Sequence, residues 1–209
     1  MLVTVVDYGS GNLASASRAL AVAASDVGIA AEVVVTNDPD LVRHADRIVL
    51  PGQGAFADCE HGLEAVPGMK AAIFEATEAG TPFLGICVGM QVLYERSDEF
   101  GDHAGLGAFA GVVRRFEHAP RVPHMGWNTL DLQREDPLLT GLRSSDRFYF
   151  VHSFAAPING CLLASVHYGE ARCAIVRQHN FHGVQFHPER SSVADARILR
   201  NFLELPACC

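Results

Sequence analysis

The sequence predicts an α/β protein whose central sheet is mostly parallel, is flanked by helices and carries an additional antiparallel hairpin region. Continuous apolar runs rich in β-branched residues are typical of strands buried on both faces of a parallel sheet. In the first half of the chain such runs alternate with helical segments, and from about residue 105 shorter strands with hairpin-like turns replace them. No linker, repeat or low-complexity tract interrupts this order, so we predict a single domain over residues 1–209.

The first half of the chain supplies the parallel strands. Strands are expected at residues 2–6, 33–36, 48–50 and 82–86. A glycine turn at residues 9–12 leads into the first helix. Helices are expected at residues 13–24, 62–79 and 88–94.

The second half supplies the hairpin region and a closing helix. Strands are expected at residues 112–116, 129–132, 148–153, 162–168, 173–178 and 182–186. Residues 194–205 are expected to form the closing helix.

Composition excludes several classes of function. The chain has 209 residues, of which 49% are hydrophobic, and a net charge of -8, so phosphate backbones would be repelled. The first residues lack the basic segment of a secretory signal peptide, and no apolar run approaches the ~20 residues that span a bilayer. We expect a cytoplasmic protein with neither nucleic acid nor membrane among its partners.

The cysteines and histidines do not form metal-binding patterns. No C-x-x-C pair occurs among the six cysteines, so neither a disulfide scaffold nor a zinc ribbon is expected. His179, His182 and His187 are close in sequence, but His179 and Asn180 are typical of a hairpin turn and no further ligand completes a set. We expect no metal and no cofactor.

The segment with the clearest chemistry is Gly85-Ile86-Cys87-Val88-Gly89. It follows a predicted strand and precedes a predicted helix, as in the elbow that presents a nucleophile at the edge of a sheet. A helix N-terminus favours the thiolate over the thiol, because its free N–H groups and dipole attract negative charge. Cys87 is therefore a candidate nucleophile. The alternative is a buried structural cysteine between two packing glycines.

His187-Pro188-Glu189 supplies a candidate base and the group that orients it. The residue before a proline disfavours helix, so His187 is expected to be extended. Side chains two positions apart in extended chain point the same way, which would let Glu189 hold the imidazole in one tautomer. Alone, the tripeptide is more typical of a surface strand end; beside the cysteine elbow, the catalytic interpretation is favoured.

Two glycine-rich turns invite a binding role. Gly52, Gln53 and Gly54 follow a predicted strand, and their backbone N–H groups, with that of Val88, could form an oxyanion hole, although a plain strand-to-helix turn is equally typical. Residues 9–14 match G-x-G-x-x-[G/A], the dinucleotide fingerprint, but the acidic residue that should support it comes too late. For that turn we favour a place beside a partner or substrate.

Three segments together resemble class I glutamine amidotransferases: residues 51–56 (PGQGAF), 85–91 (GICVGMQ) and 183–189 (GVQFHPE). The resemblance implies a flavodoxin-like class I glutamine amidotransferase fold. It also implies that Cys87 is the nucleophile, His187 the base and acid, and Glu189 the orienting group. Gln53 or Gly54 would offer an oxyanion amide, if need be after a peptide flip driven by the partner. The residues that would bind glutamine are Gln91, Glu99, Ser153 through its backbone, and Phe154.

Three other segments narrow the resemblance: residues 7–13 (DYGSGNL), 123–128 (PHMGWN) and 149–153 (YFVHS). They are similar to the branch of the family that serves as glutaminase subunit of imidazole glycerol phosphate synthases. That branch implies a heterodimer with a cyclase subunit, a (β/α)8 barrel that receives the ammonia. The residues expected at the partner interface are His124, Met125, Trp127, Asn128, Tyr149 and Arg190. Without the resemblance, Trp127 fits an exposed-loop anchor and a core position equally well.

Two departures and two rival functions remain. Many relatives have Lys and Tyr where this chain has Arg190 and Phe154, so Arg190 keeps the charge but not the ammonium geometry, and Phe154 offers no hydroxyl. An amidotransferase that feeds another synthase would keep the triad but lack residues 123–128. A flavodoxin-like binding protein with an inert or redox-active Cys87 would lack the pairing of His187 with Glu189.

Overall fold

The computed structural model describes residues 1–190 and 193–206. Its main element is an eight-stranded sheet in the order β2-β1-β3-β4-β14-β13-β12-β9. The pairs from β2 to β14 are parallel, whereas β13, β12 and β9 join antiparallel. The sheet is thus parallel on one side and a set of hairpins on the other, as the sequence predicts. The strands are β1 (Leu2–Val6), β2 (Glu32–Thr36), β3 (Arg47–Gly52), β4 (Phe83–Cys87), β9 (Asp131–Leu132), β12 (Leu162–Tyr168), β13 (Glu170–Gln178) and β14 (Phe181–Val184).

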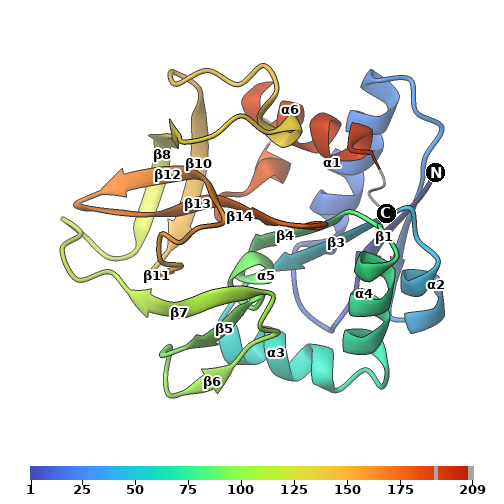
Figure 1. Ribbon diagram of the computed structural model, residues 1–209, viewed down its shortest axis with the longest axis horizontal. Helices are drawn as coiled ribbons and strands as arrows, with labels where there is room; N and C mark the ends of the chain where they lie inside the picture. Colours follow the sequence, from blue (N-terminus) through green and yellow to red (C-terminus); the bar gives the residue numbers. More distant parts are fainter. Residues whose placement is uncertain (191–192, 207–209) are drawn as a thin grey trace.

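Helices cover both faces of the parallel part (Figure 1). On one side α1 packs against the closing helix α6, and on the other α4 packs against α2 and α3. In α1 the buried side chains recur at helical spacing, and all of β3 and β4 is buried, so the core lies between the two helical layers. The helices are α1 (Leu13–Asp26), α2 (Pro39–Arg43), α3 (Phe56–Glu64), α4 (Met69–Glu78), α5 (Val88–Gln91) and α6 (Val193–Glu204).

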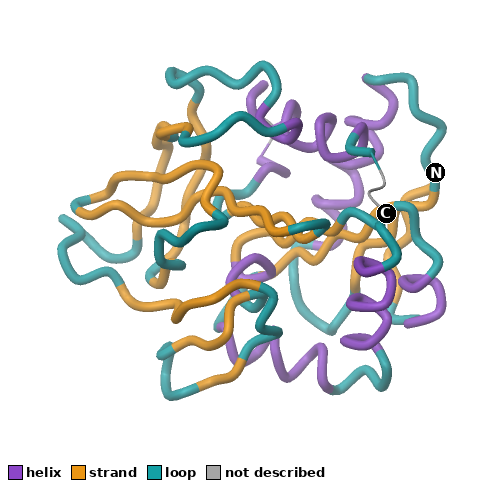
Figure 2. Tube along the Cα trace, viewed as in Figure 1, coloured by secondary structure: helices purple, strands orange, loops and turns teal. Residues whose placement is uncertain are grey.

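Two smaller sheets lie on the side of the antiparallel strands (Figure 1 and Figure 2). One has the order β11-β7-β5-β6, and the other is the antiparallel pair β10-β8. Short 3-10 turns occur at Pro137–Leu139 and Pro188–Arg190. The strands of the smaller sheets are β5 (Tyr94–Ser97), β6 (His103–Ala104), β7 (Phe109–Arg115), β8 (His124–Thr129), β10 (Arg147–His152) and β11 (Phe154–Ala155).

Two predicted helices are wrong in extent. The helix expected at residues 62–79 is two helices, α3 and α4, because Pro67 cannot donate a backbone hydrogen bond and Gly68 has a φ of 83°. The helix expected at residues 88–94 ends at Gln91, and Tyr94 already begins strand β5. Leu93 and Tyr94 are fully buried, so no polar face marks where the helix stops.

The strand expected at residues 129–132 is misplaced. Residues 124–129 form β8, which pairs with β10, whereas Asp131–Leu132 is a separate strand paired with β12. Trp127 therefore lies in a strand and not in the exposed loop that one interpretation assumed. The strand expected at residues 112–116 begins earlier, at Phe109, and β5, β6, β11, α2 and most of α3 were not predicted.

Candidate active site

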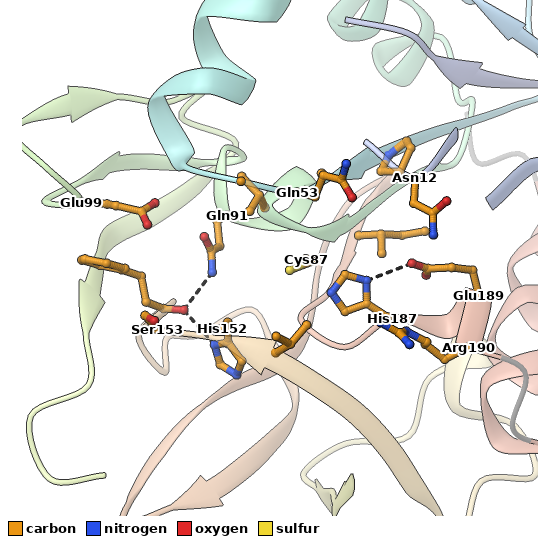
Figure 3. A pocket seen from close by; sticks show the side chains of 17 residues that line it. Asn12, Gln53, Cys87, Gln91, Glu99, His152, Ser153, His187, Glu189 and Arg190 are labelled. Carbon is orange, nitrogen blue, oxygen red and sulfur yellow. Dashed lines mark hydrogen bonds and ion pairs between the residues drawn. The ribbon is translucent and has the colours of Figure 1, made fainter. Parts of the chain in front are cut away.

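Cys87 stands at the turn between β4 and α5 (Figure 3). Its φ of 55° lies in the left-handed region, which is unusual for a residue with a side chain and typical of strained functional turns. The turn ends a fully buried strand and begins a helix, so Cys87 is the N-cap residue of α5. This is the elbow geometry that the sequence predicts.

Glycines make the elbow possible because backbone passes through the space of their missing side chains. A Cβ on Gly89 would overlap the carbonyl oxygen of Leu50, and one on Gly85 would overlap the carbonyl of Gly89. A Cβ on Gly52 would overlap the amide nitrogen of Gly89. Strands β3 and β4 and the elbow can approach one another only if these positions carry no side chain.

The parallel register of β3 and β4 places Gly52 beside Cys87. Gln53 and Gly54 continue from Gly52 along the pocket, and Gly54 has a φ of 84°. The N–H of Val88 belongs to the first turn of α5 and has no partner within that helix. The structure thus brings the predicted oxyanion donors to the nucleophile.

His187 and Glu189 form the second half of the site. The His187 Nδ1 atom lies 2.9 Å from the Glu189 Oε1 atom, and both side chains are largely buried. The His187 amide donates to the Tyr149 carbonyl at 3.1 Å, which ties this turn to β10. In Figure 3 the imidazole stands between the carboxylate and the Cys87 sulfur.

The prediction that the backbone is extended from His187 to Glu189 is wrong. Pro188–Arg190 is a 3-10 turn, because the fixed φ of proline suits the first residue of a helical turn. The turn still brings Glu189 back to the imidazole, so the predicted pair exists with a different backbone.

The electrostatics of the pocket favour a charged imidazole. Burial alone lowers the pKa of His187, but its interactions with Cys87 and Glu189 outweigh burial and raise that pKa to about 10. At neutral pH the ring is therefore protonated and can give a proton to a leaving group.

These groups line one cavity of about 310 Å³. Gln91 is buried in its wall, and its side-chain nitrogen donates to the Phe154 carbonyl and to the Gln185 Oε1 atom, each at 2.9 Å. Both amide hydrogens are thereby used within the protein, so Gln91 can offer a ligand only its oxygen. Glu99 accepts from the Phe56 amide at 2.8 Å, and burial raises its pKa. The predicted residues that line the cavity are Gly52, Gln53, Gly54, Cys87, Val88, Gln91, Glu99, Ser153, Phe154, His187, Glu189 and Arg190.

Three further polar residues of the site were not predicted. Asn12, from the glycine turn first compared with a dinucleotide site, lines the cavity, and so does His152 (Figure 3). The fully buried Gln185 points its side-chain nitrogen at the Cys87 sulfur, 3.7 Å away. A signal for Gln185 existed, since it lies two positions before His187.

Of the residues expected at a partner interface, Arg190 lies in the 3-10 turn Pro188–Arg190, and the others lie on the two faces of β8 and β10. Met125 and Trp127 are 61% and 48% exposed, and Trp127 packs edge-on against Tyr149 with ring centroids 5.6 Å apart. The Arg190 guanidinium lies over the Tyr149 ring at 4.7 Å. His124 is only 2% exposed, because alternate residues of a strand point to opposite faces, so its predicted place on that surface is wrong. Asn128 shares the inner face with His124.

Within residues 1–190 and 193–206, no three His, Cys, Asp or Glu side chains are grouped so that they could hold a metal ion. Over the same residues, no helix has the length and apolar character needed to cross a membrane. The cysteines that the structure describes, Cys59, Cys87, Cys161 and Cys173, are free thiols. Cys208 and Cys209 lie outside the described residues.

Solved structures share this fold. A crystal structure of a glutamine amidotransferase superposes with a TM-score of 0.70 at 22% identity, covering 97% of both chains. The PurLQS structure from Thermotoga maritima superposes with a TM-score of 0.69 at 21% identity, again covering 97% of both chains. At these identities the likeness concerns the fold alone.

Sequence relatives are much more similar. Imidazole glycerol phosphate synthase subunit HisH from Rhodospirillum rubrum is 49% identical over 210 residues, covering 97% of this chain and 98% of its own. The subunit of the same name from Granulibacter bethesdensis is 47% identical, covering 97% and 95%. Residues 4–205 match the family described as glutamine amidotransferase class-I. The chain therefore belongs to the class-I glutamine amidotransferases.

Proposed function

We propose that this chain is the glutaminase subunit of an imidazole glycerol phosphate synthase and that it hydrolyses glutamine at Cys87. The observation that carries the chemistry is a buried imidazole, held by Glu189 at 2.9 Å, in the same pocket as the elbow cysteine. The choice of synthase rests on relatives that are 45–49% identical over nearly the whole chain and carry that subunit name.

In the first step the Cys87 thiolate attacks the side-chain amide carbon of glutamine, and a tetrahedral oxyanion forms. The protonated His187 then gives its proton to the amide nitrogen, the C–N bond breaks and ammonia leaves. The raised pKa of His187 supports this role, because the ring holds a proton at neutral pH before the reaction begins.

In the second step water hydrolyses the γ-glutamyl thioester. The now neutral His187 takes a proton from the water, the hydroxide adds to the carbonyl carbon and the bond to sulfur breaks. Glutamate leaves, and the thiolate and imidazolium are restored. Glutamine and water are converted into glutamate and ammonia with no other reactant.

The oxyanion is held by backbone N–H groups, for which Val88 and the Gly52–Gly54 turn are the candidates. One such donor is typically worth ~3 kcal/mol of barrier. The substrate's α-amino group would be held by the Glu99 carboxylate and the Gln91 oxygen, and its α-carboxylate by backbone at Ser153 and Phe154.

Ammonia would pass to a cyclase subunit, a (β/α)8 barrel with which the chain forms a heterodimer in the cytoplasm. The cyclase would use it to convert a phosphoribulosyl-formimino carboxamide nucleotide into imidazole glycerol phosphate and aminoimidazole carboxamide ribotide in histidine biosynthesis. For the docking surface we propose the outer face of β8 and β10, with Met125, Trp127, Tyr149 and Arg190 as its contacts. Exposed aromatic, Met and Arg side chains are the residue types enriched at protein interfaces.

The chemistry is tested by labelling with a glutamine-analogue electrophile. Mass spectrometry of the wild-type chain should place the label on Cys87, in preference to the other five cysteines, and excess glutamine should protect it. A Cys87→Ala variant is the matched control and should take up little label. Equal labelling of all cysteines, without protection by glutamine, would argue against a nucleophilic role for Cys87.

A further inference from the structure

Two buried imidazoles belong to the pocket wall or lie next to it: His152 lines the cavity and His124 contacts His152, and the proposed hydrolysis uses neither. His124 on β8 and His152 on β10 are register partners, and they are 2% and 7% exposed. The Nδ1 atom of His124 lies 3.2 Å from the Nε2 atom of His152. The His124 ring is stacked on Phe150 and on Tyr168, with centroids 4.8 and 4.0 Å apart, so it has little freedom to turn.

Asn128 fixes the direction of the hydrogen bonds at one end. Its Oδ1 atom accepts from the Thr129 amide at 2.8 Å, and its Nδ2 atom donates to the His167 carbonyl at 3.0 Å. The same Nδ2 atom lies 3.3 Å from the His124 Nε2 atom. Because an amide nitrogen only donates, the His124 Nε2 atom must accept.

A carbonyl fixes the direction at the other end. The His152 Nδ1 atom lies 2.8 Å from the Phe154 carbonyl oxygen, which only accepts, so Nδ1 carries the proton. A neutral His152 then has its lone pair on Nε2 and accepts from the His124 Nδ1–H. Burial lowers the pKa of His124 to about 4 and that of His152 to about 3, so both rings are neutral at pH 7.

A series of hydrogen bonds continues from the Phe154 carbonyl to the Cys87 sulfur. The Phe154 oxygen also accepts from Gln91, whose second N–H goes to the Gln185 Oε1 atom. The Gln185 side-chain nitrogen in turn faces the Cys87 sulfur at 3.7 Å. The Phe154 oxygen thus links the two imidazoles to Gln91, Gln185 and Cys87.

We propose that His124 and His152 are positioning residues for glutamine hydrolysis: with Asn128 they hold the Ser153–Phe154 segment of the pocket wall by hydrogen bonds that all point toward it. The inference rests on the proposed function. It gives the inner face of β8 a role in the glutamine pocket, whereas the outer face of that strand is the proposed docking surface.

The tautomers of the two rings test this series of hydrogen bonds without any assay of activity. In the full chain labelled with ¹⁵N-histidine, at neutral pH, the ring shifts of His124 and His152 should show an N–H at Nδ1 and a lone pair at Nε2. His124→Phe and His152→Phe spectra assign the signals. A proton on Nε2 of either ring would overturn the proposal, and so would a charged ring at that pH.

Kinetics of the complex with the cyclase test the positioning role. His152→Phe should lower kcat/KM for glutamine about tenfold, the usual effect of losing a buried hydrogen bond, and mainly by raising KM. His152→Asn places an amide N–H near the position of Nδ1 and should restore most of the loss. Asn128→Asp replaces the donor to His124 by an acceptor and should lower kcat/KM as much as His152→Phe does. It provides the second variant if the His152→Phe protein does not fold.

The matched control is His182→Phe. His182 is another buried imidazole whose Nδ1 atom faces carbonyl oxygens, those of Asn180 at 3.0 Å and Phe83 at 3.2 Å, but it does not line the pocket. It should keep the wild-type kcat/KM. If His152→Phe and Asn128→Asp stay within about twofold of wild type, or if His182→Phe loses as much, the positioning role is wrong. A wild-type complex that does not hydrolyse glutamine contradicts the proposed function itself, and the ring shifts still report whether the hydrogen-bond chain exists.

Discussion

At the scale of single residues, the charge of His187 decides what the pocket can do. Glu189 contacts Nδ1 and leaves the other ring nitrogen on the side of Cys87, so the carboxylate orients the ring and, together with Cys87, raises its proton affinity (Figure 3). The resulting pKa of about 10 makes the imidazole an acid at neutral pH. His124 and His152 have the opposite character, because burial lowers the pKa of both rings.

Replacing Glu189 by Gln should move the pH profile of glutamine hydrolysis. A carboxylate stabilises the protonated ring, so removing its charge lowers the pKa of His187, by roughly one to three units for a close partner. The alkaline limb of kcat, which requires the protonated ring, should therefore move to lower pH by a similar amount. Glu95→Gln, outside the pocket, is the control, and an unmoved limb in Glu189→Gln would show that Glu189 does not set the charge of His187.

At the scale of elements, the elbow depends on the close packing of β3, β4 and α5. Three glycines let β3, β4 and α5 approach within the distance that a methyl group would occupy. The approach brings the Gly52 turn beside Cys87, whose φ is positive.

Gly89→Ala should therefore destabilise the protein by roughly 2 kcal/mol or more, because the new methyl group overlaps the Leu50 carbonyl and the strands must separate. Gly160→Ala is the matched control, since its Cβ would meet no atom within 4 Å. Urea unfolding measures both. An equal free energy of unfolding for the two variants would contradict this account of the elbow.

The β8–β10 ladder carries the prediction about the partner. Trp127→Ala should weaken binding to the cyclase about tenfold or more, as expected for a central aromatic anchor. Leu41→Ala removes a side chain that is 40% exposed, on α2 at the far end of the molecule, and should not change the affinity (Figure 1). Titration calorimetry measures the affinity of the two variants for the cyclase. Equal affinities would mean that the cyclase binds another surface than the outer face of β8 and β10.

The elements differ in how much of them the sequence could predict. Buried parallel strands and the cysteine elbow were predictable, because β-branched runs and glycine spacing are local signals. The short α5 was not, since residues 88–94 are all buried and periodicity needs a polar face. Nor was the contribution of Asn12, because it depends on the packing of a glycine turn against β3, where a Cβ on Gly11 would lie 3.1 Å from the Pro51 carbonyl.

At the scale of the whole molecule, three buried neutral imidazoles tie stability to pH. Burial lowers the pKa of His182 to about 4, close to the values of His124 and His152. Below the ordinary histidine pKa of about 6.5, these imidazoles bind protons in the unfolded chain but stay neutral in the folded protein. Each ring therefore makes the free energy of unfolding fall by up to about 1.4 kcal/mol per pH unit as pH drops towards 4. The raised pKa of His187 acts in another window, since its stabilisation is complete below pH 6.5 and is lost as pH rises to about 10.

The His182→Phe variant should show a weaker acid sensitivity. Between pH 7 and pH 5 its free energy of unfolding should fall by about 2 kcal/mol less than that of the wild type, because one proton-binding difference is gone. Urea unfolding at the two pH values measures it, with His44→Phe, an exposed imidazole, as the control. An unchanged difference would mean that His182 is charged in the folded protein.

We propose above that this molecule releases ammonia from glutamine for a cyclase partner. The most direct test is glutamate release by the purified chain, measured alone and with the cyclase subunit of an imidazole glycerol phosphate synthase and its nucleotide ligand, with Cys87→Ala as the inactive control. We expect a large rise in glutamate release when both are present, and none in the variant. No rise with the cyclase and its ligand would contradict the assignment to this synthase, and retained activity in Cys87→Ala would contradict the mechanism.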